Sequence, residues 1–207
     1  MYLSTGNNKL KATNKVKFLI WSIPAEKTCP FATEMCKKFC YAKKAERQYK
    51  NVRTCRAANF NDSLCNSFPA EMMVEIYKYI NRPSWKNKEI LFRIHESGDF
   101  YNREYVEKWI EVAKFYPNIQ FLAYTKSVRF FVGLEIPDNL TIRFSVWNDT
   151  SPQDLEIARS LKFPIYTAID KEGFQHIPVK NQCNCSVGCG ECGKCWLRNI
   201  DLTTEIH

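Results

Sequence analysis

The stretch EILFRIHESGDFYNREYVEKWIEVAKFYPNIQFLAYT, residues 89–125, contains a strand, a helix and a second strand in succession. Its ends, 89–95 and 119–125, are short runs rich in β-branched and aromatic residues, which is typical of buried strands. The middle, 103–116, carries charged residues on one helical face and an apolar stripe on the other, made of Val106, Trp109, Ile110 and Ala113. A helix between two such strands predicts a parallel pair with the helix covering one face.

The same alternation continues on both sides of this unit. Further strands are expected at 15–20, 140–147 and 163–169, with a sixth at 177–180 if that segment pairs. A second covering helix is expected at 151–162, where Ser151 is a suitable N-cap and Pro152 suits the first helical position. The interval 33–82 is rich in helix formers and predicts two or three helices.

Five or six strands are too few for a closed eight-stranded barrel in 207 residues. The expected fold class is therefore α/β, a partial (β/α) barrel of five to six mostly parallel strands. Residues 1–182 would form this barrel, and residues 183–207 a cysteine-rich C-terminal segment that binds metal.

The composition of the chain excludes several classes of protein. A hydrophobic fraction of 45% excludes disorder, and no apolar run approaches the roughly 20 residues that cross a bilayer. Residues 1–15 lack the apolar stretch of a secretory signal, which predicts a cytoplasmic protein and no membrane partner. In that reducing setting, clustered cysteines are more often metal ligands or catalytic thiols than disulfides. The net charge of +8 makes nucleic acid a candidate partner, although scattered lysines also fit a solvated surface.

The first cysteine group, Cys29, Cys36 and Cys40, follows the first strand. Cys36 and Cys40 would share one face of a helix, and Cys29 would reach them from a loop. No histidine is near in sequence, so three thiolates favour an iron–sulfur cluster with one iron open to a small molecule. Two other interpretations remain open: buried free cysteines, or a structural zinc site completed by Cys55 or Cys65.

Polar residues follow the other strands, at the edge where parallel α/β folds carry their chemistry. Among the residues at these strand ends are Ser97, Gly98, Asp99, Thr125, Lys126, Ser145 and Trp147, most of which carry polar groups that can contact a ligand. Asp99 could instead cap the following helix, the later residues could be barrel packing, and His95 is expected to be a core histidine. No catalytic residue is singled out.

The second cysteine group contains Cys183, Cys185, Cys189, Cys192 and Cys195. Its C-x-x-C-x-x-C run, with glycines between, favours an auxiliary iron–sulfur cluster whose fourth ligand is Cys183 or Cys185. A four-cysteine zinc knuckle is the competing interpretation.

Three cysteines after the first strand of a β/α barrel, with Phe39 before the last, resemble the cluster loop of radical S-adenosylmethionine (SAM) enzymes. The spacing differs, with six and three intervening residues where that superfamily has three and two. The segments LSTGNNKL (3–10), HESGDFY (95–101) and YTKS (124–127), with the cysteine loop ending in CYA, resemble the phage-associated gene product 88 family.

The radical SAM resemblance implies that Cys29, Cys36 and Cys40 hold a [4Fe-4S] cluster whose open iron is chelated by SAM. Reductive cleavage of SAM would start radical chemistry on an unknown substrate, with a reductant protein as partner. The segment Ser97-Gly98-Asp99 would contact the SAM amino group. A SAM or substrate pocket would be lined by Thr125, Lys126, Ser145 and Trp147. The phage resemblance implies a host cytoplasm. The alternative function is a zinc- or cluster-stabilised module that binds nucleic acid or protein without catalysis.

Overall fold

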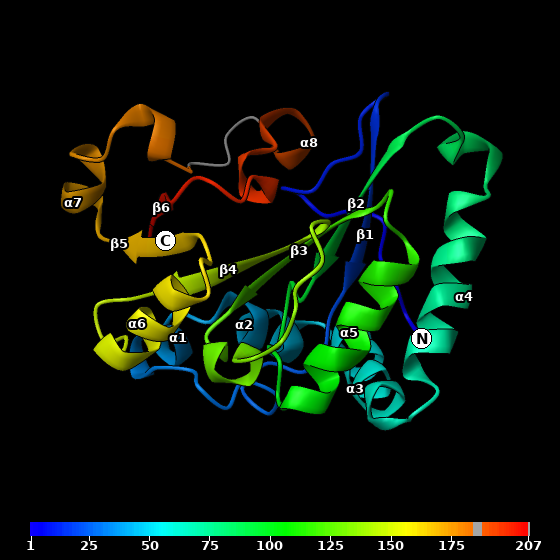
Figure 1. The fold of residues 1–207 in the computed structure, drawn as a ribbon, viewed down its shortest axis with the longest axis horizontal. Coiled ribbons are helices and arrows are strands. Elements are labelled where there is room, and N and C mark those ends of the chain that lie inside the picture. Colours follow the sequence, from blue (N-terminus) through cyan, green and yellow to red (C-terminus); the bar gives the residue numbers. More distant parts are fainter. Residues whose placement is uncertain (184–187, 207) are drawn as a thin grey trace.

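Six parallel strands form one sheet in the order of the sequence (Figure 1). This computed structural model describes residues 1–183 and 188–206. The strands are β1 (Val16–Trp21), β2 (Glu89–Ile94), β3 (Gln120–Thr125), β4 (Leu140–Val146), β5 (Ile165–Ile169) and β6 (Leu202–Glu205). The sheet is a half-barrel, so the predicted α/β fold class is confirmed.

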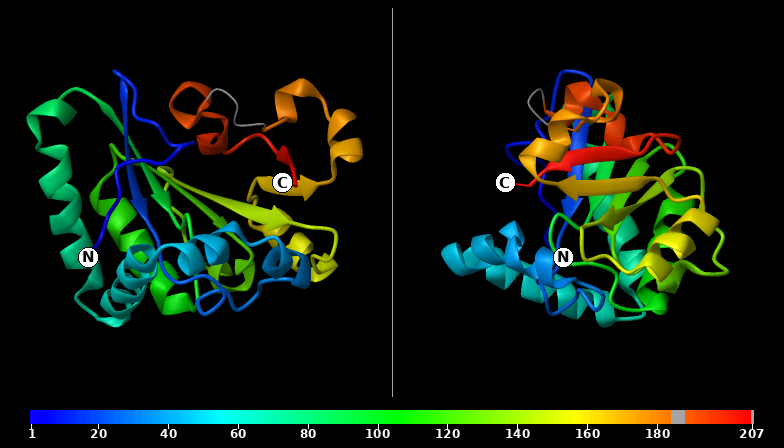
Figure 2. Two further views of the ribbon diagram at one scale, coloured as in Figure 1. Left: turned by 180° about the vertical axis from the view of Figure 1, so that it is seen from behind. Right: turned by 90° about the vertical axis from the view of Figure 1, so that its left-hand side faces the viewer.

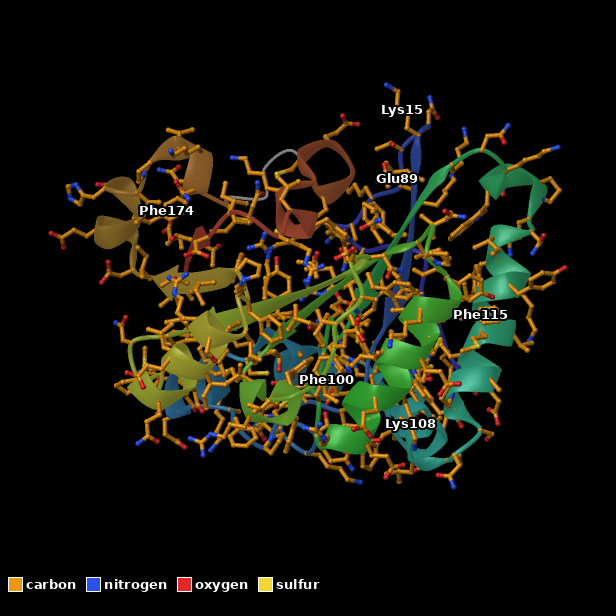
Figure 3. The ribbon with its side chains drawn as sticks, viewed as in Figure 1. Lys15, Glu89, Phe100, Lys108, Phe115 and Phe174 are labelled. Atoms are coloured by element: carbon orange, nitrogen blue, oxygen red, sulfur yellow. The ribbon has the colours of Figure 1, made fainter. Side chains whose placement is uncertain are left out.

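All strands run in one direction, so one edge of the sheet collects every amino end and the other every carboxyl end. At the amino edge, the Glu89 N–H donates to the Lys15 carbonyl at 2.9 Å. Figure 3 shows Lys15 and Glu89 together at this end and Phe100, which follows β2, toward the other. The carboxyl edge is where a ligand site of such a fold is expected.

Three amphipathic helices cover one face of the sheet (Figures 1 and 2). They are α4 (Phe68–Ile80), α5 (Arg103–Phe115) and α6 (Pro152–Ser160). The main core lies between them and the sheet, where Trp109 of α5 packs against the rings of Trp21, Phe68 and Phe92. The helices predicted at 103–116 and 151–162 are confirmed.

The opposite face is covered by the two ends of the chain (Figure 1). The C-terminal part contributes α8 (Cys189–Cys192) and a 3-10 turn, η4 (Lys194–Trp196). The Trp196 ring lies 5.9 Å from that of Phe18 on β1, and the Cys189 N–H donates to the Lys9 carbonyl at 2.8 Å. The cysteine-rich segment is thus packed onto the sheet and leads into its last strand.

Two expectations about secondary structure are wrong. Residues 177–180 do not form the sixth strand, because the last two of them belong to the turn η3 (Val179–Asn181) and the strand that pairs with β5 is β6. A parallel neighbour needs a crossover of about a dozen residues or more, which 177–180 lies too close to β5 to allow. The interval 33–82 holds four helices: α1 (Glu34–Lys38), α2 (Tyr41–Gln48), α3 (Lys50–Leu64) and α4.

Among the described residues, no helix has both the length and the apolar character that a membrane span requires.

Candidate functional site

The loop after β1 carries the first three cysteines across the carboxyl edge of the sheet. Cys29 lies before α1, Cys36 lies within α1, and Cys40 is the N-cap of α2. The expectation that Cys36 and Cys40 share one helix is wrong, because α1 ends at Lys38 and Cys40 caps the next helix. The Phe39 ring stacks on Trp147, which follows β4, with ring centroids 5.9 Å apart. This contact holds the loop against the segment that follows β4.

A second contact anchors the same loop. The Met35 N–H at the start of α1 donates to the Asp149 carboxylate at 2.8 Å. Asp149 belongs to the turn after β4, so this bond and the Phe39–Trp147 stack hold α1 over β4. The loop that carries the three cysteines therefore crosses the carboxyl edge of the sheet from β1 to β4.

The three thiols share one electrostatic environment. Burial raises the pKa of the Cys29 thiol far above its ordinary range, and Asp99, Cys36 and Cys40 raise it further. Burial also raises the pKa of Cys36, with the Lys126 ammonium acting in the opposite direction. All three are free of disulfides and partly exposed. Without a cation, Cys29 and Cys36 are therefore neutral thiols, and a bound cation would favour their thiolate forms.

The trio does not form the closed shell of a single metal ion. Within residues 1–183 and 188–206, no three cysteine, histidine or acidic side chains are gathered closely enough to hold one ion. Cys55 lies in α3 and Cys65 is exposed at its end. Neither joins the trio in such a group.

Asp99 connects the ends of β2 and β3. Its carboxylate accepts hydrogen bonds from the Thr125 hydroxyl at 2.6 Å, the Lys126 N–H at 2.8 Å and the Phe100 N–H at 2.7 Å. Burial raises the pKa of Asp99, and these donors oppose the rise. The helix-cap interpretation of Asp99 is wrong, because Asn102 caps α5 by accepting from the Tyr105 N–H.

Lys126 links the end of β3 to β4. Its ammonium donates to the Ser145 carbonyl at 2.8 Å and to the Ser145 hydroxyl at 3.4 Å, and lies 5.7 Å from the centroid of the Trp147 ring. Burial lowers the pKa of Lys126, while Cys36 and Asp99 oppose that change. The structure thus brings Asp99, Thr125, Lys126, Ser145 and Trp147 together beneath the cysteine trio.

Ser97 and Gly98 contact the cysteine loop itself. Gly98 has φ +84°, and a Cβ there would lie 2.4 Å from the Ile23 side chain and 2.7 Å from the Thr28 hydroxyl. The Ser97 carbonyl accepts from the Ile23 N–H at 3.1 Å. The close approach that Gly98 allows is therefore used by the residues that lead to Cys29.

Sequence reasoning missed a buried ion pair that supports this loop. Glu46 of α2 accepts from Arg56 of α3 at 3.0 Å, from the Ala25 N–H at 2.9 Å and from the Ser97 hydroxyl at 3.3 Å. One carboxylate thus joins the cysteine loop, α3 and the segment after β2. Ordinary helix periodicity gives no sign of it, because the partners lie on different elements.

His95 is a buried core histidine, as expected. Its Nε2 and the Tyr105 hydroxyl are hydrogen-bonded at 3.0 Å, and the Tyr105 oxygen also accepts from the Trp21 indole. Burial lowers the pKa of His95 to about 3, and repulsion from Arg93 adds to the effect. His95 is therefore neutral throughout the neutral pH range.

This neutral histidine predicts a pH-dependent stability. The unfolded chain takes up the His95 proton near pH 6.5, while the folded chain does so only near pH 3. The free energy of unfolding therefore falls as pH drops through this window, by about 1.4 kcal/mol per unit from this group. Urea denaturation between pH 6.5 and 4.5 should show a slope flatter by this amount in His95→Gln. The exposed His176 provides the control, since His176→Gln should keep the wild-type slope; equal slopes in all three proteins would contradict the assignment.

The C-terminal cysteines form a separate set. Cys183 and Cys195 are buried, with their sulfurs 3.8 Å apart, and Cys189 and Cys192 lie in α8. Cys185 lies outside the described residues. Arg143, fully buried on β4, donates to four carbonyls of this segment, those of Lys194, Cys195, Leu197 and Ile200. Its charge within the apolar run LTIRFSV is the sequence signal that could have revealed this role.

A basic pocket lies at the opposite edge of the sheet from the trio. It has a volume of about 780 Å³, and its charged lining residues are Arg159, Lys162, Lys180, Arg198 and Asp201. This excess of cations fits an anionic ligand. The nucleic-acid partner expected from the net charge stays a prediction.

Comparison with known proteins places the chain in a family. Residues 1–198 match the family model described as Gene product 88. Over 145 residues, the chain is 33% identical to the Gene 88 protein of Mycobacterium phage L5 and 32% identical to that of Mycobacterium phage D29. Each match covers 65% of this chain and 57% of the relative, so the aligned region spans little more than half of those phage proteins. No solved structure matches the chain. The chain belongs to the Gene product 88 family.

Proposed function

We propose that this protein is an iron–sulfur enzyme of radical SAM type, with its cluster held by Cys29, Cys36 and Cys40. One observation carries the proposal: the three thiols lie on the loop that follows β1 at the carboxyl edge of a six-stranded parallel half-barrel, where they interact electrostatically with one another. This edge is where folds of this architecture bind ligands and perform chemistry.

The donor set fits an iron–sulfur cluster. Thiolates are the usual ligands of such clusters, and three of them leave one iron with an open position. The described residues do not form the shell of a single ion at this place. When bound with SAM at the open position, the cluster would supply the electron that cleaves SAM.

A residue beside the trio would balance the negative charge of the bound cluster. A cluster with three thiolates is anionic, and the Lys126 ammonium interacts electrostatically with Cys29 and Cys36. This cation would offset the added negative charge and stabilise the thiolate state. Lys126 is itself fixed by Ser145 and by the Asp99 bond to its backbone, so its position requires little rearrangement on binding.

Thr125, Lys126 and Ser145 are the proposed SAM-contacting residues from β3 and β4, together with Ser97, Gly98 and Asp99 from the segment after β2. Asp99 is already engaged by three donors. Its role would therefore be to position Thr125 and Lys126. The Phe39–Trp147 stack would shield this side of the site from water.

Metal analysis tests the cluster assignment. After anaerobic reconstitution with iron and sulfide, the wild-type chain should hold about four irons at this site and absorb broadly near 400 nm. The triple variant Cys29→Ser/Cys36→Ser/Cys40→Ser should lose this iron, because no described group replaces the three ligands. Cys65→Ser is the matched control, since that exposed thiol lies outside the trio. Full iron content in the triple variant would contradict the proposal.

A further inference from the structure

Four C-terminal cysteines surround one very small cavity. The space has a volume of about 10 Å³, and its lining includes Cys183, Cys189, Cys192 and Cys195. A volume of this size is about what one water molecule needs. As the described residues leave it, this space therefore has the size of one ion, well short of a cube of four irons and four sulfides.

The buried pair of sulfurs has the spacing of two ligands of one ion. The Cys183 and Cys195 sulfurs are 3.8 Å apart, well beyond the roughly 2.0 Å length of a disulfide bond. Zinc–sulfur bonds of about 2.3 Å in a tetrahedron place neighbouring sulfurs about 3.8 Å apart. The measured separation thus matches a single tetrahedral zinc ion.

The backbone around Cys189 and Cys192 forms a tight turn beside this pair. The Gly193 N–H donates to the Cys189 carbonyl at 3.1 Å, and Gly193 ends the turn with φ +62°. A Cβ on Gly190 would lie 2.8 Å from the Lys11 carbonyl, so only glycine lets α8 approach the N-terminal segment this closely. The C-x-x-C turn is therefore held at the wall of the cavity.

We infer that Cys183, Cys189, Cys192 and Cys195 bind one zinc ion in a closed tetrahedral site. The described sulfurs are not yet gathered around one point, so binding turns the Cys189 and Cys192 side chains toward the buried pair. Four protein ligands leave no open position, which makes the site structural. The zinc ion holds α8 and η4 against the sheet, next to the carbonyls to which Arg143 donates. The auxiliary iron–sulfur cluster favoured by the cysteine spacing gives way to zinc because of the cavity size and the 3.8 Å spacing.

The test compares metal contents of the full chain after expression with both iron and zinc. Wild type should retain one zinc per chain by mass spectrometry. The double variant Cys183→Ser/Cys195→Ser should lose it, whereas Cys29→Ser/Cys36→Ser/Cys40→Ser and Cys185→Ser should keep it. Zinc retained in the double variant, or lost from Cys185→Ser, would overturn the ligand assignment. Because the trio variant carries an intact C-terminal set, failure of the radical SAM proposal leaves this result unchanged.

X-ray absorption on the wild-type chain decides the matter if the double variant does not fold. The expected zinc spectrum has four sulfur neighbours at about 2.3 Å. Zinc absent from the wild type, nitrogen or oxygen neighbours, or iron with sulfide retained in the trio variant would each refute the zinc site.

Discussion

Replacing Arg143 with methionine is expected to lower the free energy of unfolding by about 3–5 kcal/mol. The guanidinium is fully buried and donates to four carbonyls between Lys194 and Ile200, at 2.5–3.1 Å. Methionine fills a similar volume but leaves these carbonyls without their donor. Buried acceptors that lose a charged partner are among the most destabilising changes known for single side chains.

The loss should be local as well as global. Urea denaturation gives the free energy, and hydrogen exchange should show faster exchange across residues 194–200 than across α5. Arg143→Lys should recover only part of the stability, since an ammonium has three donors in place of a planar fork of five. The exposed Arg47 of α2 is the control, and Arg47→Met should change stability by less than about 0.5 kcal/mol. Equal effects of the two methionine variants would refute the role of Arg143.

The second large effect is expected for Glu46→Gln, about 3–5 kcal/mol of destabilisation. Arg56 and Glu46 are both largely buried, with side chains 9% and 15% exposed. The amide neutralises one partner and leaves the Arg56 charge buried and uncompensated. It also weakens the acceptor of the Ala25 N–H and the Ser97 hydroxyl. The cysteine loop should therefore loosen together with the fold.

An exposed pair of the same chemistry supplies the control for Glu46. Lys37 and Glu34 pair at 2.7 Å in α1, but their side chains are 44% and 87% exposed. Glu34→Gln should cost far less stability than Glu46→Gln, because solvent screens that pair. Thermal and urea unfolding of both variants test the contrast. A Glu46→Gln protein as stable as Glu34→Gln would show that the buried pair does not support the loop.

Local patterns were sufficient to predict most of the sheet and two of its covering helices. Strands β1 to β5, α5 and α6 follow from the spacing of apolar residues, because burial of one face acts within a few neighbouring residues. The position of β6 did not follow, since its short segment LTTE has weak apolar character and pairs only through a long crossover. The same limit applies to α1, because the residue after its last turn, Phe39, packs on Trp147, which is distant in sequence.

The candidate site, too, could be predicted from the sequence only in part. Because parallel strands share a carboxyl edge, the sequence placed Asp99, Thr125, Lys126 and Ser145 together, and the structure joins them by hydrogen bonds. The partners themselves could not be predicted. The sequence allowed Asp99 to be the cap of α5, but Asn102, three residues later, takes that role. Glu46 and Arg56 became partners only through the packing of α2 on α3.

The two cysteine groups also differ in a way that sequence spacing did not reveal. The trio shares a partly exposed space beside Lys126, at the edge expected to carry chemistry. The C-terminal set surrounds a space for one ion, on the face of the sheet opposite the main helices. Our proposals accordingly give a reactive role to the first group and a structural role to the second.

The most direct test of the central claim is reductive cleavage of SAM by the anaerobically reconstituted chain. With dithionite as reductant, the wild-type protein should form 5′-deoxyadenosine, measured by liquid chromatography and mass spectrometry. Cys36→Ala should reduce that product to the background of protein-free reactions, and Cys65→Ala should leave it unchanged. Product formation by Cys36→Ala at the wild-type rate, or none by an iron-loaded wild type, would contradict the account.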